Sequence, residues 1–443
     1  MGSPSIPHPP ADMNHRSRRH TRRVALGSAI GTFVEYYDFT AYGFLAITLA
    51  AVFFPTQDPT VGLLSALAVF GAAFVLRPLG GIVLGHLGDR YGRQPVLAWA
   101  VITMALSSFL VGVLPGYASA GVWATLLLVL LRGVQGLSAG GEIGGAATYV
   151  AEWSPHRRRG FMCANVQVGN LLGVLTGSVL VALLYATLDD GQMESWGWRI
   201  PFLLSLPMGL IGLYIRRRLE ESPEFEALRE DSTTAVKHES SPVATALRRD
   251  WASIVRVAGF AVGGFAGYYI VYVYGATFLH RQGGLTSSQA AWCTSGSLVL
   301  AAATVLGWGA LSDRVGRRPI LLGGFAAMAV LAYPAFLLMD TGNVTLAFLG
   351  QATLGLCEAA VMGPMMATYT ELFRTSTRFS GFGIGYNIGS ILTGGTAPYI
   401  STWLIDSTGD PRSPGLFLMT AAAISVITAL RLPETAHSPL RKD

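Results

Sequence analysis

Charged residues are scarce in this sequence. Of its 443 residues, 13% are Asp, Glu, Lys or Arg, 51% are hydrophobic, and the mean hydropathy is +0.46. Soluble domains carry about 25% charged residues, so this composition argues against a cytosolic enzyme of this length. It indicates an integral membrane protein.

Cysteine is also rare, and the common motifs of catalysis are missing. Cys163, Cys293 and Cys357 lie far apart in apolar stretches without Cys-x-x-Cys or Cys/His spacing, which disfavours a disulfide framework and a zinc site. The sequence contains no Gly-x-x-x-x-Gly-Lys-Ser/Thr loop, no His-Glu-x-x-His motif and no nucleophile elbow. We therefore expect no enzyme activity, no cofactor and no metal.

Hydrophobic stretches long enough to cross about 30 Å of hydrocarbon recur along the chain. We predict twelve transmembrane spans, at residues 24–54, 61–88, 96–115, 121–151, 161–188, 198–218, 254–280, 290–311, 320–340, 344–373, 380–405 and 414–432. The first run is longer than the apolar part of a secretory signal, which is about 7–15 residues, so we expect it to remain in the protein. An even number of spans puts both termini on one side of the membrane.

The basic residues support this topology. Of the 31 Lys and Arg residues, 26 fall in segments assigned to the cytoplasm, two (Arg281 and Arg412) fall on the opposite side, and three lie within spans or at their edges. This asymmetry follows the positive-inside rule. The pI of 9.1 therefore reflects topology and not nucleic-acid binding. We predict a multi-pass protein of the plasma (inner) membrane with both termini in the cytoplasm.

A polar stretch divides the spans six and six. Residues 219–253 are rich in Glu, Arg, Ser and Thr, which indicates a cytoplasmic linker with some amphipathic helix. We predict a basic tail at 1–23, a six-helix bundle at 24–218, this linker, a second six-helix bundle at 254–432 and a cytoplasmic tail at 433–443.

The two halves of the chain repeat each other. Between the second and third spans stands Gly85-His-Leu-Gly-Asp-Arg-Tyr-Gly-Arg-Gln-Pro95, and between the eighth and ninth stands Gly309-Ala-Leu-Ser-Asp-Arg-Val-Gly-Arg-Arg-Pro319. A second repeated pattern is Thr148-Tyr149…Glu152…Arg159 in the first half and Thr368-Tyr369…Glu371…Arg378 in the second. Two repeated six-helix halves with a substrate site between them near the midplane are the plan of many secondary transporters.

The repeated loops and the twelve spans resemble the major facilitator superfamily. Further stretches are similar to its metabolite:proton symporter branch: Glu35-Tyr-Tyr-Asp38-Phe, Arg77-Pro-Leu-Gly-Gly81, Arg132-Gly-Val-Gln135-Gly-Leu-Ser-Ala-Gly-Gly-Glu142 and Trp196-Gly-Trp-Arg199-Ile-Pro201-Phe. The resemblance covers residues 24–435 and implies an all-α membrane protein, with twelve transmembrane helices in two pseudo-repeated six-helix bundles.

The repeated loops are candidates for a cytoplasmic gate. Asp89 lies at the end of the second span, where the helix dipole disfavours an anion. The family packing implies that Asp89 faces the start of the eleventh span near Gly381, and that Asp313 faces the start of the fifth near Gly160. We assign to this gate Asp89, Arg90, Arg93, Glu152, Asp313, Arg314, Arg317 and Glu371. The alternative is a static fastening of the loops combined with topogenic positive charge.

Ionisable residues in the middle of the spans are candidates for proton coupling. Each costs about 2.5–3.5 kcal/mol to insert. The acids are Glu35, Asp38, Glu142 and Glu358, and the bases are Arg77 and Arg132. Four acids against two arginines would leave a net negative charge in a medium of low dielectric, so at least one carboxyl is expected to bind a proton.

Substrate-binding candidates lie on the same spans. Arg77 and Arg132 can donate hydrogen bonds to a carboxylate substrate, and Gln135 and Tyr42 share helix faces with the mid-span charges. Tyr268 and Tyr272 are four residues apart and can offer hydroxyls or form an aromatic box for a quaternary ammonium. The alternatives are structural ion pairs, such as Arg77 with Asp38, and simple packing of the tyrosines.

Together these features predict proton-coupled symport of a small polar metabolite by alternating access, with a mono- or dicarboxylate as the preferred substrate. A proline/betaine-type osmolyte symporter and a proton-antiport exporter remain alternatives. So does a sugar carrier, because Glu221-Ser-Pro223 and Pro433-Glu-Thr435 echo sugar-porter motifs. A sensor that does not transport is a further alternative. The expected partners are the substrate, protons and the lipid bilayer, and we expect the monomer to function.

Overall fold

The computed structural model describes residues 29–91, 93–140, 142–216, 242–375 and 377–441. These residues form helices and, apart from one isolated bridge between Arg374 and Arg441, no β-structure. Hydrophobic runs of 18 or more residues have no other way to satisfy their backbone groups inside a bilayer, so an all-helical chain is the expected outcome.

Each expected span of the first half corresponds to a helix or to consecutive helices. The spans are Ala29–Phe44 continued by α2 (Ala46–Phe53), α3 (Pro59–Tyr91), α4 (Arg93–Val113), α6 (Val122–Ala139) continued by α7 (Glu142–Trp153), α8 (Arg159–Thr187) and α10 (Arg199–Arg216). Short connecting elements are α5 (Tyr117–Ala120), η1 (His156–Arg158), α9 (Asp190–Gln192) and η2 (Met193–Gly197).

The second half is built in the same way. After α12 (Pro242–Arg249), the spans are α13 (Trp251–Tyr268) continued by η3 (Tyr269–Tyr274) and α14 (Gly275–Arg281), α15 (Ser287–Val315), α16 (Arg317–Met339), α17 (Val344–Glu371), α18 (Arg378–Gly389) continued by η4 (Ser390–Gly394) and α19 (Ala397–Thr408), and α20 (Ser413–Leu430). In the described part of the chain, eight helices are long and apolar enough to cross a membrane by themselves, and the bent first pair makes nine. The spans of α4, α10 and α18–α19 are not among these nine.

Local irregularities depart from the uniform spans expected from hydropathy. The first span bends by 63° at Leu45, and η2, η3 and η4 are π-helical segments. The turn between α15 and α16 is the single residue Gly316, whose φ of +114° is accessible without strain only to glycine. The helices therefore run deeper into the expected loop than predicted.

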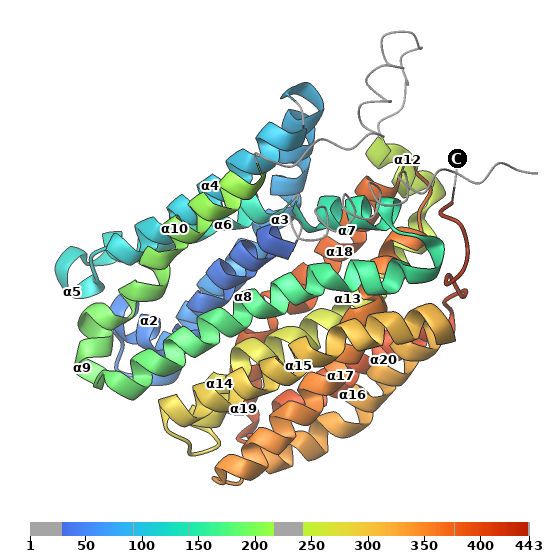
Figure 1. Ribbon diagram of the computed structural model, residues 1–443. Coiled ribbons are helices and arrows are strands. Elements are labelled where there is room, and N and C mark those ends of the chain that lie inside the picture. The colour runs from blue at the N-terminus through green and yellow to red at the C-terminus, as the bar shows by residue number, and fades with distance from the viewer. Residues whose placement is uncertain (1–28, 92, 141, 217–241, 376, 442–443) are drawn as a thin grey trace, which may run out of the picture.

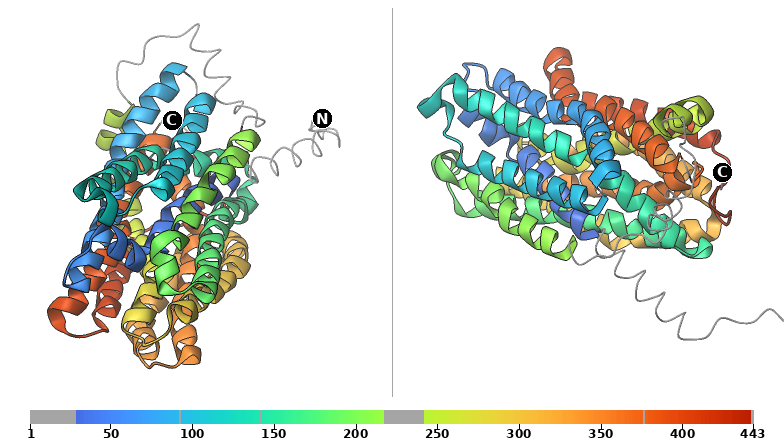
Figure 2. Two further views of the ribbon diagram at one scale, coloured as in Figure 1. Left: turned by 90° about the vertical axis from the view of Figure 1, so that its left-hand side faces the viewer. Right: turned by 90° about the horizontal axis from the view of Figure 1, so that it is seen from above.

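The two halves lie side by side, with the blue-to-green first half against the yellow-to-red second half (Figures 1 and 2). The principal contacts between them are those of α8 with α15 and α17, and those of α3 with α18, η4 and α19. At the α8–α15 crossing, a Cβ on Gly160 would lie 2.6 Å from the Gly309 carbonyl oxygen, so the two backbones meet there.

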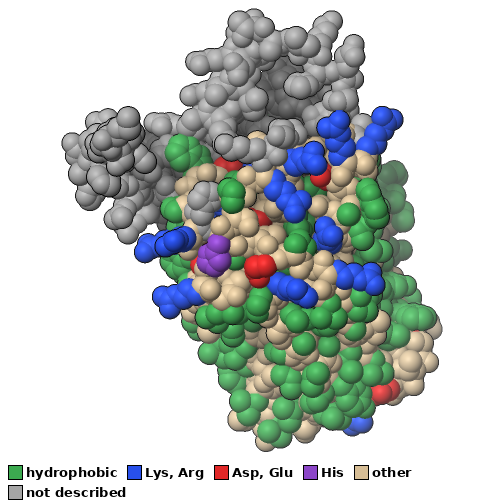
Figure 3. Space-filling view, turned by 90° about the vertical axis from the view of Figure 1, so that its right-hand side faces the viewer, with side chains coloured by type: hydrophobic (Ala, Val, Ile, Leu, Met, Phe, Trp, Pro, Cys, Tyr) green, Lys and Arg blue, Asp and Glu red, His purple; other side chains and the backbone are tan. Residues whose placement is uncertain are grey.

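Arginines gather at one end of the molecule, where α8 and α16 begin and α15 ends. We call this the basic end. Figure 3 shows basic side chains over the upper part of one face and hydrophobic side chains below them. The exposed arginines of the basic end are Arg157, Arg158, Arg248, Arg249, Arg314, Arg374, Arg431 and Arg441.

Candidate functional site

Asp313, in the last turn of α15, holds the start of α8 at the basic end. Its carboxylate oxygens accept hydrogen bonds from the backbone N–H groups of Gly160 and Phe161, both at 2.8 Å. Arg317 donates to the same carboxylate at 2.8 Å. An anion at a helix N-terminus is stabilised by the free N–H groups and the helix dipole. The contact joins the two halves where the repeat and the family resemblance place it.

Glu371 is the centre of a buried ion-pair network next to this contact. Arg159 from the first half donates to it at 2.9 Å, and Arg317 donates to it twice at 3.3 Å. The Thr435 hydroxyl donates to the second carboxylate oxygen at 2.7 Å. Because two arginines share one carboxylate beneath the surface, removing Glu371 would leave buried positive charge without compensation.

The counterpart of this pair lies across the pseudo-repeat. Arg378, at the start of α18, donates to Glu152, at the end of α7, at 2.7 Å. The repeated pattern of Glu152…Arg159 and Glu371…Arg378 therefore appears in space as two reciprocal ion pairs. In each pair, an acid from one half meets the arginine of the other half.

The C-terminal segment covers the same network. Glu434 accepts from the backbone N–H of Arg317 at 2.8 Å and of Arg318 at 3.2 Å. The Arg441 carbonyl accepts from the Thr375 N–H at 3.1 Å and from Arg378 at 3.3 Å. These contacts fasten residues that follow the last span over the closed basic end.

Some predicted residues fall outside what the structure describes or outside this network. The side chains of Asp89, Arg90, Arg93 and Glu142 lie outside the described residues. Arg314 is described and exposed, which agrees with a topogenic charge.

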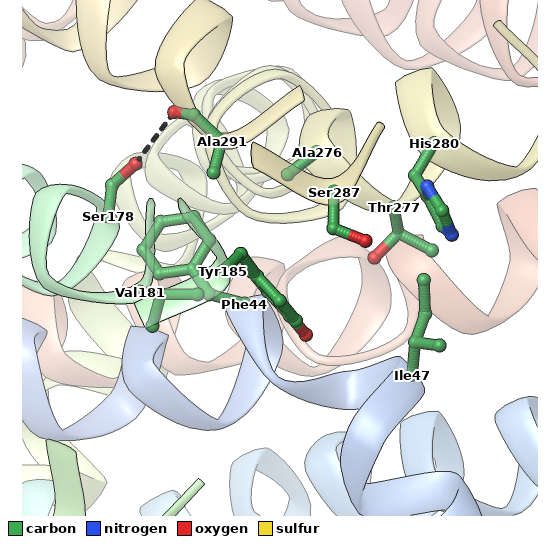
Figure 4. A pocket seen from close by; sticks show the side chains of 10 residues that line it. All are labelled: Phe44, Ile47, Ser178, Val181, Tyr185, Ala276, Thr277, His280, Ser287 and Ala291. Carbon is green, nitrogen blue, oxygen red and sulfur yellow. Dashed lines mark hydrogen bonds between the residues drawn. The ribbon is translucent and has the colours of Figure 1, made fainter. Parts of the chain in front are cut away.

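At the opposite end, a small cavity is lined by polar and apolar side chains from both halves (Figure 4). Ser178 of α8 makes a 2.8 Å hydrogen bond with Ser295 of α15. Tyr185 bonds Thr48 at 2.8 Å, and His280 contacts the Leu285 carbonyl at 2.9 Å. The halves therefore touch at both ends in this conformation.

Arg77 and Glu35 form a buried ion pair in the middle of the first half, with 3.7 Å between the guanidinium and the carboxylate. The guanidinium carbon lies 4.3 Å from the ring centroids of both Phe39 and Phe74. The sequence suggested an ion pair of Arg77 with Asp38 as an alternative. In the structure, the partner of Arg77 is Glu35. The two aromatic rings attract the guanidinium charge and reduce its cost of burial.

The guanidinium group of Arg132 interacts with side chains of the first half. It donates to Gln135 at 2.7 Å, and Gln135 donates to Ser108 at 2.9 Å. Its guanidinium carbon also lies 4.4 Å from the centroid of Tyr42, whose hydroxyl donates to the Ala66 carbonyl at 3.0 Å. The three residues predicted to bind substrate here form a packed structural unit.

Asp38 is fully buried beside this unit. Neither of its carboxylate oxygens has a hydrogen-bond partner among the described residues, while Ser108, Ser205 and Arg132 are close enough to act on it electrostatically. Burying a carboxyl with this little compensation is costly, which keeps Asp38 a candidate for proton coupling.

A central cavity lies between the halves, lined by tyrosines, amides and methionines. From the first half come Tyr36, Gln167 and Asn170, and from the second come Tyr268, Glu358 and Tyr386. Tyr36 and Tyr386 share a 3.1 Å hydroxyl hydrogen bond, and Tyr268 donates to Asn170 at 2.7 Å. This cavity joins spans 1, 5, 7, 10 and 11.

Only two of the predicted site residues, Tyr268 and Glu358, line this cavity in the described structure. Tyr272 instead donates to the Gly355 carbonyl at 2.6 Å. Sequence reasoning missed Tyr36, Asn170 and Tyr386. Tyr36 carried a usable signal, because it sits between Glu35 and Asp38 in a motif already singled out.

The match to known proteins settles the family. A family model described as "Sugar (and other) transporter" matches residues 24–442. The chain belongs to this family. The protein is therefore a membrane transporter and not an enzyme, as the sequence predicts.

Individual relatives span almost the whole chain. The proline/betaine transporter of Salmonella typhimurium (strain LT2) is 36% identical over 95% of this chain and 85% of its own length. The ectoine/proline transporter ProP of Corynebacterium glutamicum is 38% identical over 97% of this chain and 87% of its own. The solved structure of the MFS (major facilitator superfamily) proton:xylose symporter XylE bound to 6-bromo-6-deoxy-D-glucose superimposes with a TM-score of 0.77 at 16% identity, over 96% of this chain and 98% of that one. The expected fold and the family resemblance are confirmed.

Proposed function

We propose that the protein is a proton-coupled symporter of zwitterionic osmolytes of the proline, betaine and ectoine type. The observation that carries this proposal is the 36–38% identity to transporters named for these solutes over nearly the full chain. Of the readings left open by the sequence, the osmolyte alternative is favoured over the carboxylate.

The central cavity supports the same choice. Among the described residues, no Lys or Arg lines it, and Arg132 is engaged elsewhere. A bare mono- or dicarboxylate would find no cation there. A zwitterion of small size brings its own positive charge and needs only hydroxyls, amides and one acid.

The coupling and gating roles follow from position. We assign proton coupling to Asp38, with Glu35 and Glu142 as further candidates. We assign closure of the basic end to the Asp313–Gly160 contact and to the two reciprocal ion pairs. By the positive-inside rule this end faces the cytoplasm, and the bundles 24–218 and 254–432 rock against each other. One chain supplies both walls of the cavity, which suits a functional monomer.

Uptake by proteoliposomes tests this proposal. With an inward proton gradient, labelled glycine betaine, proline or ectoine should accumulate, whereas malate and xylose should not. Accumulation of malate alone would restore the carboxylate reading, and accumulation of xylose alone would favour the sugar carrier. A lack of accumulation with all five solutes would overturn the proposed symport.

A further inference from the structure

We infer that the central cavity is an ammonium cage, in which Glu358 supplies the counter-charge and tyrosine rings supply the walls for the positively charged nitrogen of the substrate. This inference rests on the proposed function and assigns which part of the zwitterion binds where.

Glu358 is a buried acid with no ion-pair partner among the described residues. It lies at the midpoint of α17, is 1% exposed, and faces the cavity. Its Oε2 atom has no hydrogen-bond partner, and no ion pair involves Glu358 in the described part of the chain. Burying such a group without compensation is costly. A ligand that carries a positive charge would remove this cost.

The backbone leaves room for the carboxylate. Gly267 of α13 faces the Oε2 atom of Glu358, and a Cβ at this position would collide with that atom. The acid therefore lies against α13, the helix that also carries Tyr268.

Aromatic rings surround the space beside this acid. The rings of Tyr36 and Tyr268 meet edge to face with centroids 5.6 Å apart, and the rings of Tyr369 and Tyr386 do so at 6.3 Å. Ring faces attract a cation, most strongly where water is excluded. The hydroxyl bonds from Tyr36 to Tyr386 and from Tyr268 to Asn170 fix the ring positions across the two halves.

The remaining wall suits methylated or methylene-rich groups. Met362, Met365 and Met366 line the cavity on the same helix as Glu358, and thioether chains adapt to small apolar shapes. The polar groups of the cavity include the hydroxyls of Tyr36 and Tyr386 and the side-chain amides of Gln167 and Asn170. These groups can donate hydrogen bonds to the substrate carboxylate while the nitrogen lies beside Glu358.

Binding of two isosteres to the purified wild-type protein in nanodiscs separates charge from shape. Glycine betaine and tert-butylacetate share a carboxylate and three methyl groups, but only betaine carries a positive nitrogen. Isothermal titration calorimetry should give a dissociation constant for tert-butylacetate at least about tenfold higher than for betaine. Equal affinity for the two compounds would overturn the cage.

Substitutions test which residues bind the positively charged nitrogen of betaine. Glu358→Gln and Tyr268→Leu should each weaken betaine binding by about tenfold or more and reduce the preference over tert-butylacetate. Tyr274→Phe is a matched control, because Tyr274 is buried in the neighbouring η3 segment and bonds Thr402 outside the cavity. Unchanged betaine affinity in folded Glu358→Gln protein would contradict the inference. If that variant does not fold, the comparison of betaine with tert-butylacetate on the wild-type protein still tests the ammonium cage. A wild-type protein that transports betaine but binds both isosteres equally refutes the cage alone, whereas failure to transport any osmolyte refutes the proposed function.

Discussion

The Arg159 guanidinium donates to the Glu371 carboxylate at 2.9 Å across the two halves of the chain, although the side chains are only 1% and 3% exposed. The reciprocal pair, Arg378 with Glu152, joins the halves in the opposite sense at 2.7 Å. A pseudo-twofold repeat places the same charges at equivalent positions of both halves. The closed basic end is therefore held by two symmetry-related ion pairs, each of which must separate if that end opens.

Glu371→Gln should strongly destabilise the protein in this conformation. The substitution leaves Arg159 and Arg317 buried without their shared carboxylate, a loss of about 3–5 kcal/mol. Thermal unfolding in detergent should show a clearly lower Tm. Glu194→Gln, which changes an exposed acid at the opposite end, should leave the Tm unchanged; an equal effect of the two substitutions would show that the network contributes little.

Asp313→Asn should open the basic end more often. The neutral amide loses charged hydrogen bonds to the start of α8, worth about 1.5–3 kcal/mol each. Cys163 reports the opening, because it is buried in α8 one turn after Arg159 and Gly160, where Asp313 holds the helix.

Maleimide labelling with peptide mapping should show Cys163 reacting about tenfold faster in Asp313→Asn than in the wild type. Asp406→Asn, at an exposed position of α19 at the opposite end, should not change the rate. Equal labelling of all three proteins would remove Asp313 from the gate.

Gly316→Ala should strain the turn between α15 and α16. The φ of +114° lies outside the range that alanine prefers, and a Cβ there would collide with Glu434. We expect a loss of about 1–3 kcal/mol, measured as a lower Tm. Gly323→Ala is the matched control, because its Cβ meets open space within α16 and should leave stability unchanged or raise it. A Gly316→Ala protein as stable as the control would show that the turn relaxes freely.

Asp38→Asn should separate transport from proton coupling. Asp38 is buried without a hydrogen-bond partner among the described residues, whereas Glu35 is held by Arg77. The variant should retain exchange of labelled osmolyte against unlabelled osmolyte inside vesicles but lose accumulation driven by a pH gradient. Full accumulation by Asp38→Asn would transfer the coupling role to Glu35 or Glu142.

Hydropathy and charge alone predict the fold closely. All twelve expected spans correspond to helices, because a chain in hydrocarbon must satisfy its backbone hydrogen bonds within each segment. The family resemblance also predicts the contact of Asp313 with the start of α8. The bend at Leu45 and the π segments η2, η3 and η4 were not predictable, since they depend on tertiary packing and leave the hydrophobic pattern unchanged.

The site was less accessible to sequence reasoning. Arg132 was expected to bind substrate because a charge within a span is costly, yet Gln135 and Tyr42 compensate it locally. Tyr36 and Tyr386 lie 350 residues apart, and neither hydropathy nor spacing reveals that they meet. Which face of each helix turns toward the other half is decided by packing between the bundles.

The central claim is that an osmolyte and protons move together through this protein. The most direct measurement is external pH in a weakly buffered suspension of proteoliposomes when glycine betaine is added. The account predicts alkalinisation that matches betaine uptake, is absent from empty liposomes and is lost in Asp38→Asn. Betaine uptake without a pH change, or with acidification, would contradict it.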